Sequence, residues 1–184
     1  MDIFFLFQVD TLIDRAPRKT FIEISVDTKV VGYVILLLDI EGYFSQNFIH
    51  QCTGDLGSGY ADAFPVGHVK EKSRGSYLQF QSVKSVFHIN WEKEKNKNKY
   101  KTHCLKAGDL VGRISDDKTS IEIIIDDYQF PSKQPRFGKV VFGFEHVKRA
   151  IELSQEKKKN IFITNSGLIG HPSVLEDQCK IWQK

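Results

Sequence analysis

The sequence is poor in the residue patterns that most enzyme classes require. Its three cysteines are widely spaced and form no CxxC pair, which argues against a disulfide framework and a structural zinc site. None of its six histidines forms an i, i+4 pair, and neither a phosphate-binding loop nor a GxSxG motif is present. The sequence therefore predicts no metal, no cofactor and no catalytic residue of these classes.

A strong net charge and a long apolar run are also missing. The net charge is +3 over 184 residues, with both signs mixed, so the field of the whole molecule indicates neither a nucleic acid nor a membrane as partner. The first apolar run, residues 3–7, is too short for a membrane span or a signal sequence, and Asp2 replaces the usual basic residue. We therefore expect a protein of a reducing compartment, the cytoplasm or the nucleus.

That short apolar run is a candidate partner-binding segment. It consists of Ile3, Phe4, Phe5, Leu6 and Phe7. Five apolar residues in a row are unfavourable in water. We expect them either to pack on the domain as an extra strand or turn, or to dock on a partner protein, and we assign residues 1–19 to an N-terminal extension.

The periodicity of the apolar residues predicts a β-rich domain with two helices. Residues 21–27 alternate as a half-buried strand does, and the nearly unbroken apolar run 30–39 is typical of a strand covered on both faces. Together they predict an antiparallel hairpin. Further strands are predicted at 82–90, 121–126, 137–144 and 161–164, and helices at 42–52 and from 145 onwards. Two helices that are segregated from the strands along the chain favour a barrel or a sandwich with helical caps.

Four segments of the chain resemble the motifs of one known family, in the order and with the spacing that the family shows. NFIHQCTGDLGSGY (47–60) is the most specific, since it is similar to the family's first helix and the glycine loop after it. FIEISVDTKVVGYVILLLD, FGKVVFGFEHVKRA and IFITNSGLI resemble the opening hairpin, the strand with the second helix, and the closing strand. This family is the cyclophilins, the peptidyl-prolyl cis-trans isomerases, and the chain resembles it over roughly residues 20–169, with a tail at 170–184. It implies an eight-stranded antiparallel β-barrel capped by two α-helices.

The residues that the family uses for catalysis are changed. Twisting the prolyl bond requires an apolar pocket for the proline ring and an arginine that stabilises the deconjugated amide. With Phe64 aligned on the first phenylalanine of the family's FHR motif, Val66 replaces this arginine. The other changed groove positions are Glu71, Lys72, Arg74, Ile123, Gln129 and Gln134. Residues 110–120 are expected to form a loop, shorter than in the family, along one wall of the groove.

Three functions remain open on this basis. We favour a catalytically inactive cyclophilin-like domain that acts as a protein-protein interaction module. The second is a divergent isomerase or proline-peptide binder, in which Arg74 or Arg113 replaces the missing arginine. The third is RNA binding through the lysine-rich stretch, because lysines and aromatic rings suit single-stranded nucleic acid, although such charge runs are usually solvated loops. Its residues are Trp91, Lys93, Lys95, Lys97, Lys99, Tyr100 and Lys101.

Overall fold

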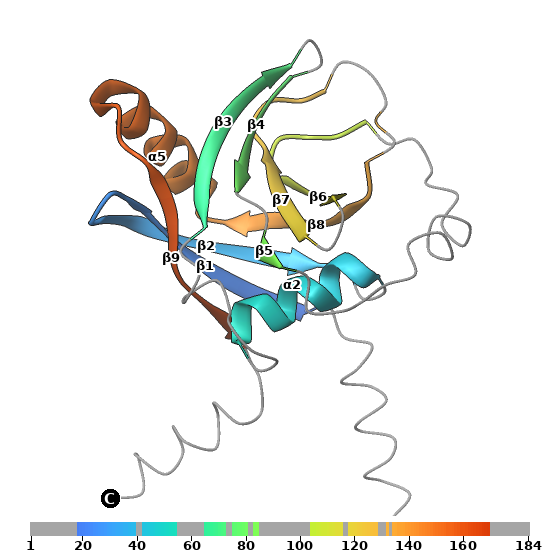
Figure 1. The fold of residues 1–184 in the computed structure, drawn as a ribbon. Helices are drawn as coiled ribbons and strands as arrows, with labels where there is room; N and C mark the ends of the chain where they lie inside the picture. Colours follow the sequence, from blue (N-terminus) through green and yellow to red (C-terminus); the bar gives the residue numbers. More distant parts are fainter. Residues whose placement is uncertain are drawn as a thin grey trace, which may run out of the picture.

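Strands joined in one sheet dominate the computed structural model (Figure 1). It describes residues 18–39, 42–54, 65–72, 75–80, 83–84, 104–115, 118–128, 132 and 134–169. The strands are β1 (Arg18–Val26), β2 (Lys29–Leu38), β3 (Val66–Lys72), β4 (Gly75–Phe80), β5 (Val83–Lys84), β6 (Asp109–Ser115), β7 (Lys118–Ile124), β8 (Arg136–Phe142) and β9 (Ile161–Ile169). The helices in these residues are α2 (Tyr43–Thr53) and α5 (Phe144–Lys157).

Eight of the strands close into an antiparallel barrel. Their order is β4-β3-β9-β1-β2-β8-β6-β7, and β7 pairs back with β4, so that Tyr77 lies opposite Ile124 and Gln79 opposite Glu122. The short strand β5 pairs with the start of β7. Closure removes the free edges that an open sheet would expose. The predicted fold class, mainly β with an eight-stranded antiparallel barrel and two helices, is confirmed.

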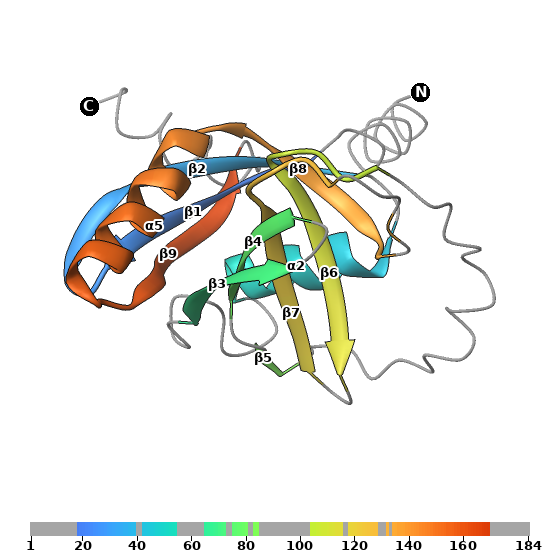
Figure 2. The same ribbon diagram turned by 90° about the horizontal axis from the view of Figure 1, so that it is seen from above.

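The two helices pack near opposite ends of the strands (Figures 1 and 2). Helix α2 lies where β8 begins and β9 ends, because Ser45 Oγ donates to the Phe137 carbonyl and Ser166 Oγ donates to the Cys52 carbonyl. Helix α5 lies beside the start of β2, where the His146 ring packs on Gly32. The predicted apolar stripe of the first helix is buried as expected: Phe44, Phe48, Ile49 and Cys52. Each helix therefore adds its apolar face to the barrel core.

The hairpin β1–β2 supplies much of that core. Ile22, Ile24 and Val26 are buried, as their alternation predicts. The prediction that residues 30–39 are covered on both faces was wrong, because Val30 and Tyr33 are each 49% exposed. Val34, Leu36 and Leu38 face the core, and Val31 also packs against it. Tyr33, Ile35 and Leu37 alternate with the core residues and lie on the outer face of the barrel.

Residues 110–120 are not a groove-wall loop as expected. They contain most of β6 and the start of β7, two strands paired from Leu110–Ile123 to Ser115–Lys118. Gly112 and Arg113 interrupt the apolar pattern of β6, which concealed this strand in the sequence. The interruption has a structural cause, since the Phe44 ring of α2 packs directly over Gly112.

This contact predicts the effect of a small substitution. A Cβ at Gly112 would lie 2.0 Å from a ring carbon of Phe44, so Gly112→Ala forces the helix or the ring to move. We expect it to lower the free energy of unfolding by about 1 to 3 kcal/mol, measured by urea denaturation. Adding Phe44→Leu makes room, so the double variant should lose less than the sum of the two single losses. Strictly additive losses would show that the ring does not restrict this position.

Candidate functional site

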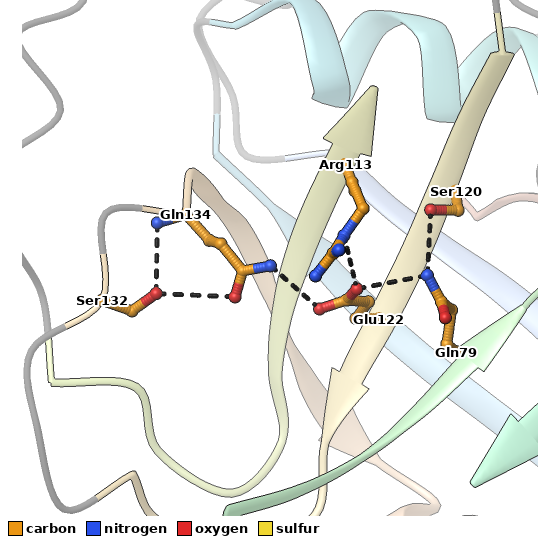
Figure 3. A network of polar contacts seen from close by, with 6 residues as sticks. All are labelled: Gln79, Arg113, Ser120, Glu122, Ser132 and Gln134. Carbon is orange, nitrogen blue, oxygen red and sulfur yellow. Dashed lines mark hydrogen bonds and ion pairs between the residues drawn. The ribbon is translucent and has the colours of Figure 1, made fainter. Parts of the chain in front are cut away.

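The outer face of strands β4, β7 and β6 carries a cluster of polar side chains, here called the polar network (Figure 3). Its members are Gln79, Arg113, Ser120, Glu122, Ser132 and Gln134. Strand register brings them together, since Gln79 lies opposite Glu122 across β4–β7 and Arg113 lies opposite Ser120 across β6–β7. Gln134 reaches the same place from the segment before β8, where its backbone N–H donates to Ser132 Oγ at 3.1 Å.

Glu122 lies at the centre of the polar network and is fully buried. Its Oε1 lies 3.0 Å from Arg113 Nε and accepts a hydrogen bond of 3.3 Å from the Gln79 amide. Its Oε2 accepts a bond of 3.2 Å from the Gln134 amide. A buried carboxylate is strongly unfavourable unless it is paired and hydrogen-bonded, and here each oxygen has a donor. The polar network is therefore built around one negative charge.

The alternation of β7 explains how this carboxylate comes to be buried. Ile121 and Ile123 face the barrel core, while Glu122 and Ile124 face outwards. Beside the polar network, Ile124 belongs to a second apolar cluster on the outer face: Tyr77, Leu105, Val111, Ile124 and Tyr128. All five are buried, so this cluster covers the outer face of β7 and leaves no open apolar slot among its own members.

Hydrogen bonds in a short turn hold Leu105 and Tyr128 of this cluster in place. The backbone N–H of Tyr128 donates to the Leu105 carbonyl at 2.9 Å, which joins the two segments that cross the outer face. Asp127 accepts a bond of 2.9 Å from the Ala107 N–H and contacts Lys106 Nζ, also at 2.9 Å. The backbone donor of Ala107, and then Lys106, hold the pKa of the Asp127 carboxyl below its usual value. Asp126 instead contacts Ser76, so these adjacent carboxylates act as separate turn residues.

Few of the predicted groove positions meet in this region. Gln134 belongs to the polar network, but Ile123 is fully buried in the barrel core. Val66 starts β3, half-buried and opposite Phe162 of β9, while Glu71 is exposed near the other end of β3. The backbone of Lys72 pairs with Gly75 at the end of the same hairpin. Outside the described residues lie Phe64, Arg74 and Gln129.

The two other predicted binding segments also lie outside the described residues. These are the apolar run, with Ile3, Phe4, Phe5, Leu6 and Phe7, and the lysine-rich stretch 91–101. The sequence patterns assign no role to Gln79 and Glu122. They indicate Arg113 only as a substitute for the missing catalytic arginine. The signal in the sequence was Glu122 itself, a single acid within the isoleucine-rich stretch 121–125.

The chemistry of the polar network is that of a neutralised charge. The Arg113 side chain is 41% exposed, but its Nε is ion-paired with a carboxylate that has no exposure. Its Nε–H does not point at that oxygen closely enough for a hydrogen bond, so the contact is an ion pair. Elsewhere, burial raises the pKa of the Cys52 thiol, which keeps it protonated and unsuited to act as a nucleophile. The polar network itself thus offers charge pairing around a buried carboxylate.

No protein-family model matches the sequence, and no curated protein matches it. In the described ranges, neither helix has the length and apolar character needed to cross a membrane. The same ranges contain no group of three or more histidine, cysteine, aspartate or glutamate side chains placed to hold a metal ion.

The ion pair at the centre of the polar network predicts an asymmetric mutational response. Arg113→Met leaves the buried Glu122 carboxylate without a cation and should lower the free energy of unfolding by about 2 kcal/mol, discounted because Arg113 is partly exposed. Glu122→Met added to it removes the stranded charge, so the double variant should be more stable than Arg113→Met alone.

The matched control is Arg149→Met, which breaks the exposed pair of Arg149 and Glu152 on α5. Its effect should stay within about 0.5 kcal/mol. All variants are compared by urea denaturation at neutral pH. Equal losses for Arg113→Met and Arg149→Met would contradict a buried ion pair.

Proposed function

We propose that this chain is a cyclophilin-like domain that lacks isomerase activity and functions by binding protein partners. The motif resemblance over residues 47–60 supports the family, and a closed eight-stranded barrel with two helices is the fold that this resemblance implies. Because a fold is retained more readily than the site it carries, family membership alone does not assign catalysis. The activity has to be argued from the side chains.

The observation that carries the proposal is the ion pair of Arg113 with the buried Glu122. Prolyl isomerisation needs a cation that donates to the substrate amide while its C–N bond rotates. Arg113 lies 3.0 Å from a fully buried carboxylate. Turning this guanidinium to a substrate would strand the carboxylate, which typically costs several kcal/mol. Arg113 is therefore a poor substitute for the family's arginine.

The structure also gives little support for the apolar pocket that the reaction requires. A proline ring needs an open apolar pocket, whereas the cluster around Ile124 is closed by Leu105 and Tyr128. On β3, Val66 is apolar but half-buried, and Glu71 presents an exposed charge. Glu71 stands where the family resemblance expects an apolar residue of the pocket, and a charge there opposes burial of an apolar ring. Neither Arg113 as the donor cation nor the cluster around Ile124 as the apolar pocket meets these requirements, and both observations therefore argue against isomerase activity.

A role in binding fits the remaining features. The cysteines Cys52 and Cys104 are free, in keeping with a reducing compartment, and we propose the cytoplasm or the nucleus. The partner class that we propose is protein, because the barrel carries partly exposed apolar side chains, among them Tyr33 and Phe142. No cofactor is needed for such a role.

An isomerase assay tests the proposal directly. A proline-containing tetrapeptide is followed with and without the full chain, and an active cyclophilin serves as positive control. We expect the uncatalysed rate, with relaxation over roughly tens of seconds at 25 °C. An acceleration that grows in proportion to the concentration of this chain would overturn the proposal.

Restoring the arginine alone should not restore activity. In Val66→Arg the guanidinium returns to β3, but the pocket positions stay changed, so we expect turnover to remain at background in the same assay. Circular dichroism and a thermal melt establish that the variant is folded. Family-like rates in this single variant would mean that the groove is intact apart from one side chain.

A further inference from the structure

A row of paired residues crosses the outer face of strands β9, β1, β2 and β8, with a shift in the β2–β8 register directly after Ile35. Phe21 lies opposite Gly167 on one side and Ile35 on the other, and Ile35 lies opposite Phe142. Tyr33 flanks this row on one side and Leu37 on the other. We call the five apolar residues the apolar band: Phe21, Tyr33, Ile35, Leu37 and Phe142. Figure 2 shows β9, β1 and β2 side by side.

Two of the five side chains of the apolar band are exposed, and the other three are half-buried. Phe142 is 57% and Tyr33 is 49% exposed. The Phe21 and Tyr33 rings meet edge to face at 6.0 Å, and the Phe21 ring lies over Gly167, where a Cβ would be 2.6 Å from it. Contiguous apolar surface of this kind marks a contact site.

One border of the apolar band is basic. Leu37 lies between Lys19 of β1 and Lys139 of β8 in the strand register, and both lysines are exposed. Lys19 directly follows Arg18, the first residue of β1. The chain therefore enters the barrel at this basic border.

We propose that residues 3–7 of this same chain cover the apolar band. Ten residues separate Phe7 from Arg18, enough to reach about 35 Å when extended. The four strands under the band span only about 15 Å, since neighbouring strands lie about 4.8 Å apart. The segment therefore reaches every part of the band without strain.

The sequence of the segment complements the surface. Residues 3–7 are all apolar, like the band, and acids flank them at Asp2, Asp10 and Asp14. Asp10 and Asp14, which lie between the segment and Arg18, match the lysines at this basic border, whereas the border beside Tyr33 carries Glu23. Charge at the rim with apolar residues at the centre is the usual arrangement of a specific contact. This inference does not depend on whether the barrel has isomerase activity, and it implies that a partner binding this face must first displace residues 3–7.

A thermodynamic cycle on the full chain tests the contact. In the segment variant, residues 3–7 are all replaced by serine; in the band variant, Phe142→Ser removes the most exposed ring. Each should lower Tm by about 3 °C or more, and the double variant should lose no more than the larger single loss. Val30→Ser is the matched control, because Val30 is 49% exposed on the same strand as Tyr33 but lies outside the band. Its effect should add to that of the segment variant.

Cross-linking gives a second measurement that does not depend on stability. In a chain carrying Cys104→Ser and Cys179→Ser, Phe5→Cys is combined with Phe142→Cys or with Val30→Cys. We expect the disulfide within one chain to form about tenfold faster or more with the Phe142→Cys partner. Equal rates, full additivity in the cycle, or an unchanged Tm in the segment variant would overturn the proposal. A disulfide between chains, together with a Tm that rises with concentration, would assign the band to a second copy instead.

Discussion

The barrel depends on one constraint: β7 has to pair with β6 and β4 while both of its faces are buried. The inner face is covered by the core around Ile123, and the outer face by the cluster of Ile124 with Leu105 and Tyr128. Among the β7 side chains that the structure describes, from Ser120 to Ile124, Glu122 carries the charge. Its position leaves water no access to the carboxylate, so the neighbouring strands must supply the partners. Arg113 from β6 and Gln79 from β4 do so, and closure of the barrel and satisfaction of the charge are therefore coupled.

The same coupling bears on the proposed loss of catalysis. A catalytic donor is useful when its hydrogen-bonding capacity is directed at the substrate and becomes fully used only in the transition state. In the polar network the cation is already engaged by a carboxylate in the ground state, at 3.0 Å. The ion pair holds the Arg113 guanidinium against Glu122 in the closed barrel. The more tightly it is held there, the less it is able to donate to an amide whose C–N bond is rotating. The network thus supports a structural role for Arg113.

The sequence predicts the local elements well and the long-range ones poorly. The hairpin of β1 and β2, the buried stripe of α2 and the glycine that ends it at Gly54 follow from periodicity and helix capping, which are properties of neighbouring residues. The strand β6 was not predicted, because Gly112 interrupts its apolar pattern. The reason for a glycine there is the packing of the Phe44 ring of α2, which is distant along the chain. The burial of Glu122 was equally hidden, since it depends on Gln134 and on the register of β7 with β4. Contacts between residues that are distant along the chain were not predicted, because only the closed barrel brings these residues together.

The wrong prediction for β2 is physically informative. Its apolar run looked like that of a strand covered on both faces, and the composition of the strand does have that character. The structure covers one face with the barrel core, around Leu36, and leaves Tyr33 exposed on the other. The outer face of β7 shows the contrasting solution, since the turn held by Asp127 places Leu105 over it. Removing apolar surface from water is favourable, so the exposed outer face of β2 is where the proposed contact with residues 3–7 would stabilise the barrel.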